Sequence, residues 1–416
     1  MNQNTSKTIP LPVATFNGPT FPAPLTHDGH HGRNPFASQT KLLWHMDRLA
    51  EWRLRGDTFP VLMEINLTNY CNEACKWCIS AYSHISNPAM TSDEKQHQLK
   101  LLDQSSAISN HPERRRGLDI DYLGPFLKRA KAMGLRAVTW SGGGEPTTHP
   151  QFMDAVRQAG ALGLEQGLMT NGFFKKSYIA ELGNSLKWIR VSLDTLDRAK
   201  YKEQKVTDAL PHVLENIQEL AKYSVTVGVN MNLAEWNVDE ISSMASWSKH
   251  VGADYFQIRP VLGLPFNLAR NAPYRTQSKL DWSRIKPILF QAEAQSSNRF
   301  KVLVSWDKFD DVSDVEGNFG RTYSKCLYHF FVCVVNANGD LCVCMYHLGD
   351  REFSFGNIYE QSLDDIWAGP KRQKVLQMCS GGLDLSTCQV CCKGHEINKL
   401  MHFIESPDQE TDANFL

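Results

Sequence analysis

The eleven cysteines of the chain fall into two groups, and each group could bind a metal centre. The first group is Cys71, Cys75 and Cys78, with the spacing C-x3-C-x2-C. Three thiolates on one short loop can bind three irons of a four-iron cluster, which leaves the fourth iron open to another ligand. An open iron is a place for chemistry. The second group contains the other eight: Cys326, Cys333, Cys342, Cys344, Cys379, Cys388, Cys391 and Cys392.

Zinc is the alternative metal for the first group. A structural zinc site usually has four protein ligands, commonly on paired C-x2-C segments, whereas this loop offers three thiolates and no obvious fourth ligand nearby. Disulfides are disfavoured, because the number of cysteines is odd and the sequence begins without a positive segment followed by an apolar run. We therefore expect a cytoplasmic protein whose thiolates bind metal.

The composition is that of an ordinary globular protein. Hydrophobic residues make up 42% and charged residues 21% of the chain, and the formal net charge is -1. This balance argues against nucleic acid as a partner, and no segment approaches the roughly 20 apolar residues of a membrane span. The length of 416 residues suits a barrel-sized core with an appended module. We expect an N-terminal extension at 1–58, a core at 59–265, a bridging segment at 266–325 and a C-terminal module at 326–416.

The elements that must position the first cysteines alternate between strand and helix. Amphipathic helical segments separate six apolar or β-branched runs that predict strands: 61–67, 137–140, 167–170, 188–193, 225–233 and 255–258. Alternation of this kind specifies parallel strands with right-handed crossover helices, so we expect an α/β fold with a partial or complete (β/α)6 TIM-like barrel. Polar motifs follow several of these strands, at the edge that forms the catalytic rim of parallel barrels.

The first cysteine loop resembles the signature of a known enzyme family. The segment NLTNYCNEACKWC, residues 66–78, is similar to the cluster-binding motif of the radical S-adenosylmethionine (radical SAM) enzymes. The resemblance implies a 4Fe–4S cluster on Cys71, Cys75 and Cys78, with S-adenosylmethionine bound to the open iron. It also implies that Trp77 lies near the adenine of this cofactor.

Further motifs fit the same resemblance. The glycine-rich turn Ser141-Gly142-Gly143-Gly144-Glu145-Pro146 follows the second predicted strand, and glycines let backbone groups approach a ligand closely. In the family, the corresponding stretch binds the amino group of the methionine moiety, a role that Gly143, Gly144 and Glu145 inherit.

Three rim residues follow the later strands. The resemblance suggests that Ser192 contacts the carboxylate of the cofactor, and that Asn171 and Asn232 point into the same cavity. The alternative for each is a rim or turn residue whose hydrogen bonds are satisfied within the protein. Gln257 and Arg259 end the sixth predicted strand, where they face cofactor or substrate or serve the structure alone.

The second cysteine group resembles the auxiliary-cluster module of radical SAM enzymes. Cys326 and Cys344 lie in the pattern C-x12-G-x4-C, with Gly339 in a predicted hairpin turn, and Cys388 and Cys391 form a C-x2-C pair. We take these four as ligands of one cluster in the shorter form of the module, called twitch. The longer form, SPASM, continues with further cysteines, and none follows Cys392. Cys342 in place of Cys344, Cys392 in place of Cys391, and zinc in place of iron are the open alternatives.

The resemblance implies the reaction class. Two 4Fe–4S clusters and S-adenosylmethionine, with an external electron donor such as flavodoxin or ferredoxin, would generate a 5'-deoxyadenosyl radical that abstracts hydrogen from a substrate. Because the twitch form occurs in dehydrogenases that act on aminocyclitols, we expect a small polar substrate, such as a sugar, an aminocyclitol or a nucleotide-linked sugar, and an oxidoreductase-type reaction. A peptide-modifying maturase is the alternative. A non-catalytic iron–sulfur or zinc protein is a third hypothesis, which the three-cysteine loop and the glycine-rich turn oppose.

Overall fold

A single sheet runs through the described part of the protein. The computed structural model describes residues 39–78, 117–261, 280–313, 321–348, 351–385, 388 and 392–405. Within these ranges ten strands pair in the order β10-β9-β8-β1-β2-β3-β4-β5-β6-β7. Their bounds are β1 Leu62–Asn66, β2 Ala137–Ser141, β3 Glu165–Thr170, β4 Trp188–Ser192, β5 Thr226–Leu233, β6 Tyr255–Pro260, β7 Lys301–Val304, β8 Val332–Val335, β9 Asp340–Cys342 and β10 Ser354–Asn357.

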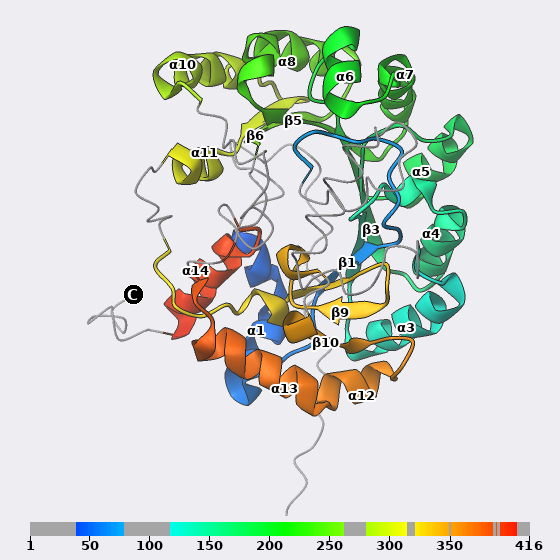
Figure 1. The fold of residues 1–416 in the computed structure, drawn as a ribbon, viewed down its shortest axis with the longest axis vertical. Coiled ribbons are helices and arrows are strands. Elements are labelled where there is room, and N and C mark those ends of the chain that lie inside the picture. The colour runs from blue at the N-terminus through cyan, green and yellow to red at the C-terminus, as the bar shows by residue number, and fades with distance from the viewer. Residues whose placement is uncertain are drawn as a thin grey trace, which may run out of the picture. The chain divides into compact units, whose positions relative to one another are not determined.

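Helices connect the parallel strands and cover the outer face of the curved sheet (Figure 1). In chain order the α-helices are α1 Met46–Arg55, α3 Ile120–Met133, α4 Phe152–Ala161, α5 Ile179–Ser185, α6 Arg198–Lys205, α7 Leu210–Leu220, α8 Ile241–His250, α10 Trp282–Glu293, α11 Trp306–Ser313, α12 Leu363–Ala368, α13 Pro370–Gln377 and α14 His395–Glu405. Short 3₁₀ turns join several of them, among them η1 Gln39–His45, η6 Glu235–Glu240 and η7 Tyr328–Phe330. Within the described residues no helix is both long and apolar enough to cross a membrane.

The two faces of each strand have different residues, as the alternation of side chains requires. In β1, Met63 and Ile65 are fully buried in the core under the helices, whereas Glu64 and Asn66 point to the inner face. The helices begin and end at sequence signals. In α3, for example, Asp119 accepts a hydrogen bond from the backbone N–H of Asp121, and Gly134 closes the helix with a φ of 110°.

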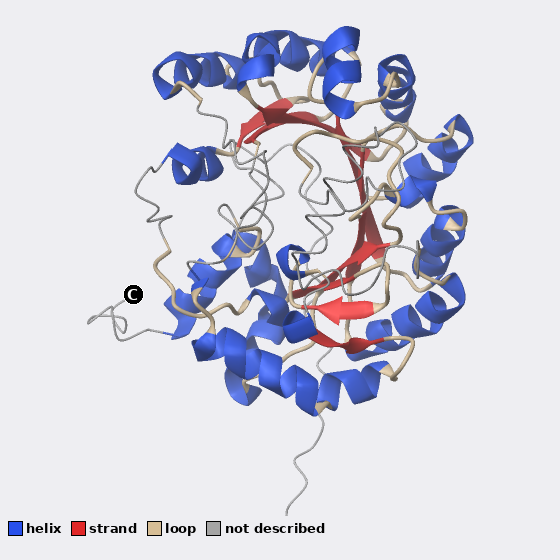
Figure 2. Cartoon of the chain, in the orientation of Figure 1, coloured by secondary structure: helices blue, strands red, loops and turns tan. Residues whose placement is uncertain are grey.

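The predicted α/β fold is confirmed. All six predicted strands are present, and β1 to β6 pair in parallel in chain order. The sheet does not close, so the barrel is partial: β7 and β10 are its two edges (Figure 2). β7 pairs in parallel with β6 and so adds a seventh strand from the predicted bridging segment.

The predicted C-terminal module continues the same sheet. β8 and β9 form the expected hairpin, with Gly339 at a φ of 86° in its turn. β8 also pairs in parallel with β1, the strand that precedes the first cysteine loop. Residues 34–416 form one compact unit, and the boundaries predicted at 265 and 325 stay predictions because the sheet runs across both. Most of the predicted extension at 1–58 lies outside the described residues.

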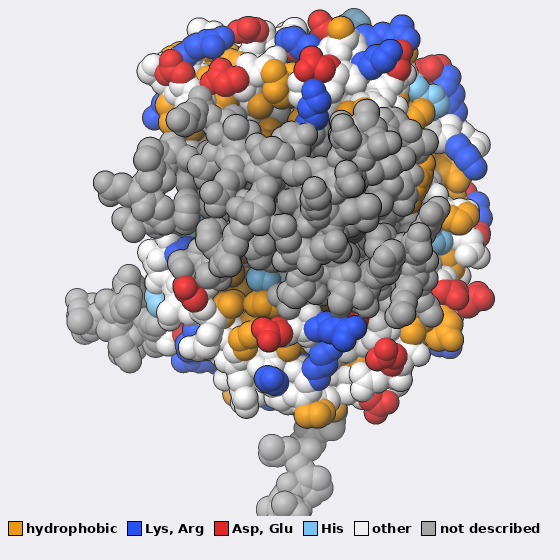
Figure 3. Space-filling view, in the orientation of Figure 1, with side chains coloured by type: hydrophobic (Ala, Val, Ile, Leu, Met, Phe, Trp, Pro, Cys, Tyr) orange, Lys and Arg blue, Asp and Glu red, His pale blue; other side chains and the backbone are white. Residues whose placement is uncertain are grey.

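The charged side chains on the visible face are mixed in sign. Figure 3 shows acidic and basic side chains interspersed among the coloured residues of this face. This arrangement agrees with the formal net charge of -1. The described part of that face therefore has no large patch of side chains of one charge.

Candidate functional site

The first cysteine loop follows β1 and is bonded to the glycine-rich turn that follows β2. The backbone N–H of Gly144 donates to the carbonyl of Thr68 at 2.9 Å, and that of Glu145 donates to the carbonyl of Tyr70 at 2.9 Å. A Cβ atom on Gly144 would lie 2.0 Å from the Tyr70 carbonyl oxygen, so no larger residue fits there. The glycine therefore allows the two loops to lie in contact at the carboxyl edge of the sheet.

The Glu145 carboxylate joins this turn to the end of β3. Its Oε1 accepts hydrogen bonds from the Thr147 N–H at 3.1 Å, the Thr147 hydroxyl at 2.6 Å and the Thr170 hydroxyl at 2.7 Å. Its Oε2 accepts only the Asn171 N–H, at 2.8 Å, among the described residues. Burial raises the pKa of Glu145, and these donors lower it. A carboxylate oxygen has two lone pairs, so Oε2 can accept a further donor such as an ammonium. The predicted contact of Glu145 and Gly143 with the cofactor's amino group stays a prediction.

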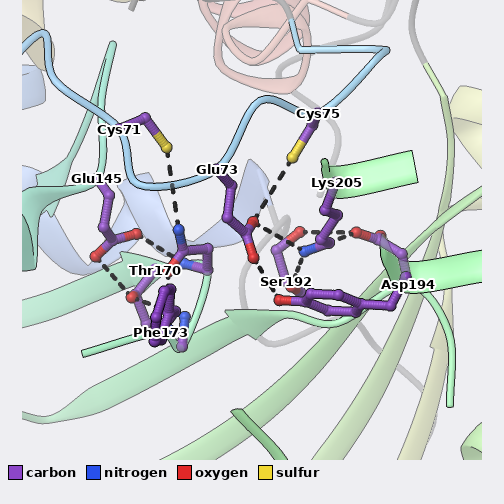
Figure 4. Close-up of polar contacts among 12 residues, drawn as sticks. Cys71, Glu73, Cys75, Glu145, Thr170, Phe173, Ser192, Asp194 and Lys205 are labelled. Carbon is purple, nitrogen blue, oxygen red and sulfur yellow. Dashed lines mark hydrogen bonds and ion pairs between the residues drawn. The ribbon is translucent and has the colours of Figure 1, made fainter. Parts of the chain in front are cut away.

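Asn171 lies beside the first cysteine. Its side-chain amide donates to Asn72 at 2.7 Å and lies 4.0 Å from the Cys71 sulfur, while its carbonyl accepts the Phe173 N–H at 2.8 Å. The structure thus brings Asn171 to the cysteine loop, as Figure 4 shows for its neighbours Cys71 and Phe173. Trp77 packs against Trp236 of η6, with ring centroids 5.4 Å apart.

Ser192 and Asn232 meet at the ends of β4 and β5. The Asn232 side chain donates to the Ser192 hydroxyl at 3.4 Å and to Asp194 Oδ1 at 3.0 Å, and the Asn232 backbone N–H also donates to Oδ1 at 2.7 Å. Asp194 takes a φ of 69°, which is uncommon outside glycine. The two predicted rim residues are therefore close together. Their contact with the cofactor stays a prediction.

A buried charge network connects the cysteine loop to this part of the rim (Figure 4). Lys205, at the end of α6, is 1% exposed. Its ammonium lies 3.5 Å from Glu73 and 3.3 Å from Asp194, and it donates to the Ser192 carbonyl at 2.5 Å. Glu73 lies between the first two cysteines and also accepts a hydrogen bond from the Tyr201 hydroxyl. Burial raises the pKa of Glu73, and the Lys205 charge lowers it.

Sequence reasoning missed this network. Glu73 stands inside the quoted cysteine motif, which was a signal, but Lys205 lies 132 positions later on a helix of mostly charged residues. From the sequence alone, a lysine on such a helix is expected to be exposed to solvent. Backbone bonds show why it is buried: the N–H groups of Ala74 and Lys76 donate to the carbonyls of Lys205 and Gln204 at 3.0 and 3.1 Å.

The three thiols of the first loop fit an iron–sulfur cluster by their chemistry. Burial, together with the nearby Glu73 carboxylate, holds the pKa of the Cys71 and Cys75 thiols well above its usual range. Both are therefore neutral without metal, and binding iron would release their protons. No set of three or more Cys, His, Asp or Glu within the described ranges surrounds a single metal ion. The ligands of a four-iron cluster are spaced more widely than those of one ion, because an iron–sulfur cube lies between them.

Part of the second cysteine group gathers at the C-terminal module. Burial and the charges of Cys392 and Cys326 raise the pKa of Cys344. Burial and the Cys392 charge likewise raise the pKa of Cys388, to about 11. Burial and the charges of Cys379, Cys392 and Cys388 raise the pKa of the Cys326 thiol. Cys326, Cys344, Cys388 and Cys392 are therefore neighbours in space.

Of the remaining cysteines, Cys379 also lies beside Cys326, and Cys333 and Cys342 lie in the hairpin. Cys333 and Cys342 are fully buried in β8 and β9, where burial raises the pKa of Cys333 and the Arg372 charge lowers it. The carbonyl of Cys379 accepts the Cys326 N–H at 2.9 Å. Cys391, which we predicted as a ligand, lies outside the described residues.

Iron analysis can decide the fourth ligand of the auxiliary cluster. Because Cys392 lies near the other three thiols, we expect Cys392→Ala to lower the iron content from about eight to about four per chain. Cys391→Ala should keep the full content, as should the core control Cys333→Ala. Loss of iron in Cys391→Ala with none in Cys392→Ala would return the role to Cys391.

A cavity of about 480 Å³ lies on the inner face of the sheet. β1 to β4 and β6 supply one wall, and the segment that leads into α14 supplies another. Met169 lines it from β3, two residues before Asn171 on the same face, and Cys392 lines it from the C-terminal module. The cavity therefore begins at the amino ends of β1 to β4, follows β3 as far as Met169 and reaches the second cysteine group at Cys392. Its other lining residues include Arg190, Gln257, Arg259 and Lys393.

Comparison with known families finds two matches. The profile of the radical SAM superfamily matches residues 65–247, and that of the SPASM iron–sulfur cluster-binding domain matches residues 326–392. The second match ends at Cys392, and a single cluster in this module stays a prediction.

Individual relatives are distant. The tungsten-containing aldehyde ferredoxin oxidoreductase cofactor-modifying protein of Pyrococcus furiosus is 25% identical over 335 residues, which are 74% of this chain and 80% of that protein. A probable GTP 3',8-cyclase of Pyrococcus abyssi is 28% identical over 193 residues, 46% of this chain and 54% of that protein, so the match spans about half its length.

Solved structures share the fold. SuiB of Streptococcus suis, bound to S-adenosylmethionine, superposes with a TM-score of 0.57 at 18% identity, over 82% of this chain and 72% of that one. AnSMEcpe with bound AdoMet gives a TM-score of 0.54 at 14% identity, over 86% of this chain and 100% of that one.

Proposed function

Because the chain belongs to the radical SAM superfamily and carries a SPASM iron–sulfur domain, we propose that it modifies a peptide substrate by radical chemistry. Its cofactors are 4Fe–4S clusters and S-adenosylmethionine. When bound and reduced, they supply a 5'-deoxyadenosyl radical that abstracts hydrogen from an unactivated C–H bond. The electron donor we propose is a flavodoxin or ferredoxin, and the number of clusters we propose is two.

The position of the cavity carries this proposal. Cys392 of the auxiliary module lines it, and so does Met169, two residues before the Asn171 that lies beside Cys71. A substrate that enters the cavity would therefore contact the auxiliary module and extend along β3 toward the first cysteine loop. Holding two reacting groups next to each other in the right orientation speeds their reaction, so the residues that line the cavity act by orienting the substrate. Cys326, Cys344, Cys388 and Cys392 would bind an auxiliary cluster near one end of this cavity, and such a cluster would supply one-electron redox chemistry there.

The chain's own residues bind and orient the cofactor. The thiolates of Cys71, Cys75 and Cys78 would bind the first cluster, and Oε2 of Glu145 would accept a hydrogen bond from the amino group of the methionine moiety. Lys205 fixes Glu73 and Asp194 and so holds the cysteine loop against the ends of β4 and β5. Trp77 offers an aromatic face, packed on Trp236, for the adenine.

The comparisons favour a peptide over the small polar metabolite that the twitch resemblance suggested. SuiB is described with its precursor peptide SuiA bound, and that structure superposes with a TM-score of 0.56. AnSMEcpe is described with a peptide bound, with a TM-score of 0.54.

A small anionic molecule is the second candidate. The probable GTP 3',8-cyclase of Pyrococcus abyssi matches 46% of this chain, and the cofactor-modifying protein matches 74% of it. The cationic lining of the cavity would suit a nucleotide as well as an acidic peptide.

Anaerobic turnover assays separate the two candidates. The cluster-loaded full chain is incubated with S-adenosylmethionine, a reductant and either a peptide library or a panel of nucleotides and sugars. We expect deoxyadenosine release to rise with peptides, together with a change in the mass of a peptide. Coupling to nucleotides or sugars with none to any peptide would reject the peptide proposal and support the small-molecule one.

A further inference from the structure

Two arginines line the cavity from β4 and β6, the strands on either side of β5, four residues apart in register. Arg190 lies on β4 opposite Gly228, and Arg259 lies on β6 opposite Asn232. Arg190 donates to Gln257 Oε1 at 3.1 Å and contacts the Met169 sulfur at 3.0 Å. Neither partner carries a charge. Both guanidinium groups line the cavity.

The positive charge of these arginines is not balanced by the described residues around them. Glu64 lies on the inner face of β1, but its carboxylate is already paired with Lys393. The other acids of the lining are Glu165 and Asp307, which are exposed, and Glu396, which lies 3.5 Å from Lys399. No carboxylate in the described part of the chain forms an ion pair with Arg190 or Arg259.

The arginines also act on each other. Burial, the larger cause, and the Arg259 charge lower the pKa of Arg190 to about 10. Arg190 therefore stays cationic near neutral pH. Like charges gathered in a partly buried cavity are unfavourable unless an anion joins them.

An unsatisfied acceptor lies next to the pair. Asn230 stands on β5 between Ser192 and Gln257, is 5% exposed, and its Oδ1 is buried without a hydrogen-bond partner. A buried acceptor without a donor costs free energy. A ligand with an N–H or O–H group near its anionic end would satisfy it.

We propose that Arg190 and Arg259 form an oxyanion-binding subsite that takes a carboxylate or phosphate group of the substrate. The inference rests on the proposed function, in which the cavity is the substrate site. The planar guanidinium fork matches the geometry of both oxyanions, and Gln257 keeps the Arg190 fork in place. For a peptide substrate the anion is an acidic side chain or the terminal carboxylate, and the adjacent amide N–H faces Asn230.

The subsite sets the direction of the substrate. Arg190 pairs across the sheet with Met169 of β3, and Asn171, which directly follows the end of β3, lies beside Cys71. An anion held at Arg190 therefore places the neighbouring carbon atoms toward the carboxyl rim of the sheet, where the first cluster is proposed. The arginines are positioning residues in this scheme.

Binding of small probes without turnover tests the subsite. The cluster-loaded full chain with S-adenosylmethionine and no reductant is titrated with N-acetylglutamate amide and its neutral analogue N-acetylglutamine amide, and with phosphoserine and serine, by ligand-observed NMR. We expect at least one anionic probe to bind about tenfold or more tightly than its neutral analogue. The double variant Arg190→Gln/Arg259→Gln should lose this preference. A preference for carboxylate or for phosphate identifies the source of the anion.

Control variants show whether a lost preference comes from the two arginines. Arg157→Gln removes an exposed arginine whose partner is Glu181, and it should keep the preference. Unchanged affinity for S-adenosylmethionine shows that a variant is folded. If the double variant does not fold, Arg259→Gln alone is tested instead, and it should weaken the preference several-fold. Equal binding of charged and neutral probes to the wild type, or an unchanged preference in a folded Arg259→Gln variant, overturns the subsite. Because no turnover is needed, either result leaves the peptide assay to judge the proposed function separately.

Discussion

The variant Cys71→Ala/Cys75→Ala/Cys78→Ala should release no 5'-deoxyadenosine from S-adenosylmethionine above background. The three thiols are on one loop after β1, and no other cysteine of the described residues is near it, so the first cluster loses all of its protein ligands. Side chains alone cannot supply the electron for this cleavage. Chromatography of anaerobic reactions with excess reductant measures the product.

Iron content shows whether this loss is local. The triple variant should keep about four irons per chain in the auxiliary module, since about four belong to each cluster. Cys333→Ala and Cys342→Ala are matched controls, because both thiols are fully buried in the C-terminal hairpin. Each should cleave S-adenosylmethionine at close to the wild-type rate. Deoxyadenosine formation by the triple variant at an appreciable rate would refute the assignment of the first loop.

The local parts of this site could be predicted from the sequence. The six strands alternate with amphipathic helices, so their order and parallel pairing follow from residue pattern and connection rules. The glycine-rich turn predicted a close approach to a ligand, and the structure shows that Gly144 also allows a close approach to the Tyr70 carbonyl. Such features depend on a few neighbouring residues.

Long-range contacts could not be predicted in the same way. The pairing of β8 with β1 joins residues about 270 positions apart. The apolar pattern of each strand predicts a strand but does not specify which strand it pairs with. The same limit applies to Lys205, whose burial depends on Glu73 and Asp194 from other elements.

The substrate is subject to this limit as well. Arg190, Asn230 and Arg259 come from three strands, and their joint charge and hydrogen-bonding needs exist only when the sheet has formed. The sequence showed Arg259 as a lone cation at a strand end. Only the folded sheet brings Arg190 near Arg259, and these two cations together lead us to expect an anionic group on the substrate.

Replacing Lys205 with methionine should destabilise the protein by about 3–5 kcal/mol, because it leaves two buried carboxylates without their countercharge. Methionine has a similar length, so the loss reports the charge more than the volume. Glu73 and Asp194 lie within 3.5 and 3.3 Å of the ammonium that is removed. Urea titrations of the variant and wild type, prepared in parallel, measure the difference in the free energy of unfolding.

Two further variants separate the charge network from a general effect of removing a lysine. Lys200→Met removes a lysine of the same helix whose ion pair with Glu240, at 2.9 Å, is partly exposed, so it should cost less than about 1 kcal/mol. Glu73→Gln placed in the Lys205→Met background removes one of the two unpaired charges and should restore part of the stability. Because Glu73 lies between Cys71 and Cys75, Lys205→Met should also bind less iron at the first site. Equal stability of the two lysine variants would mean that the buried network does not hold the cysteine loop in place.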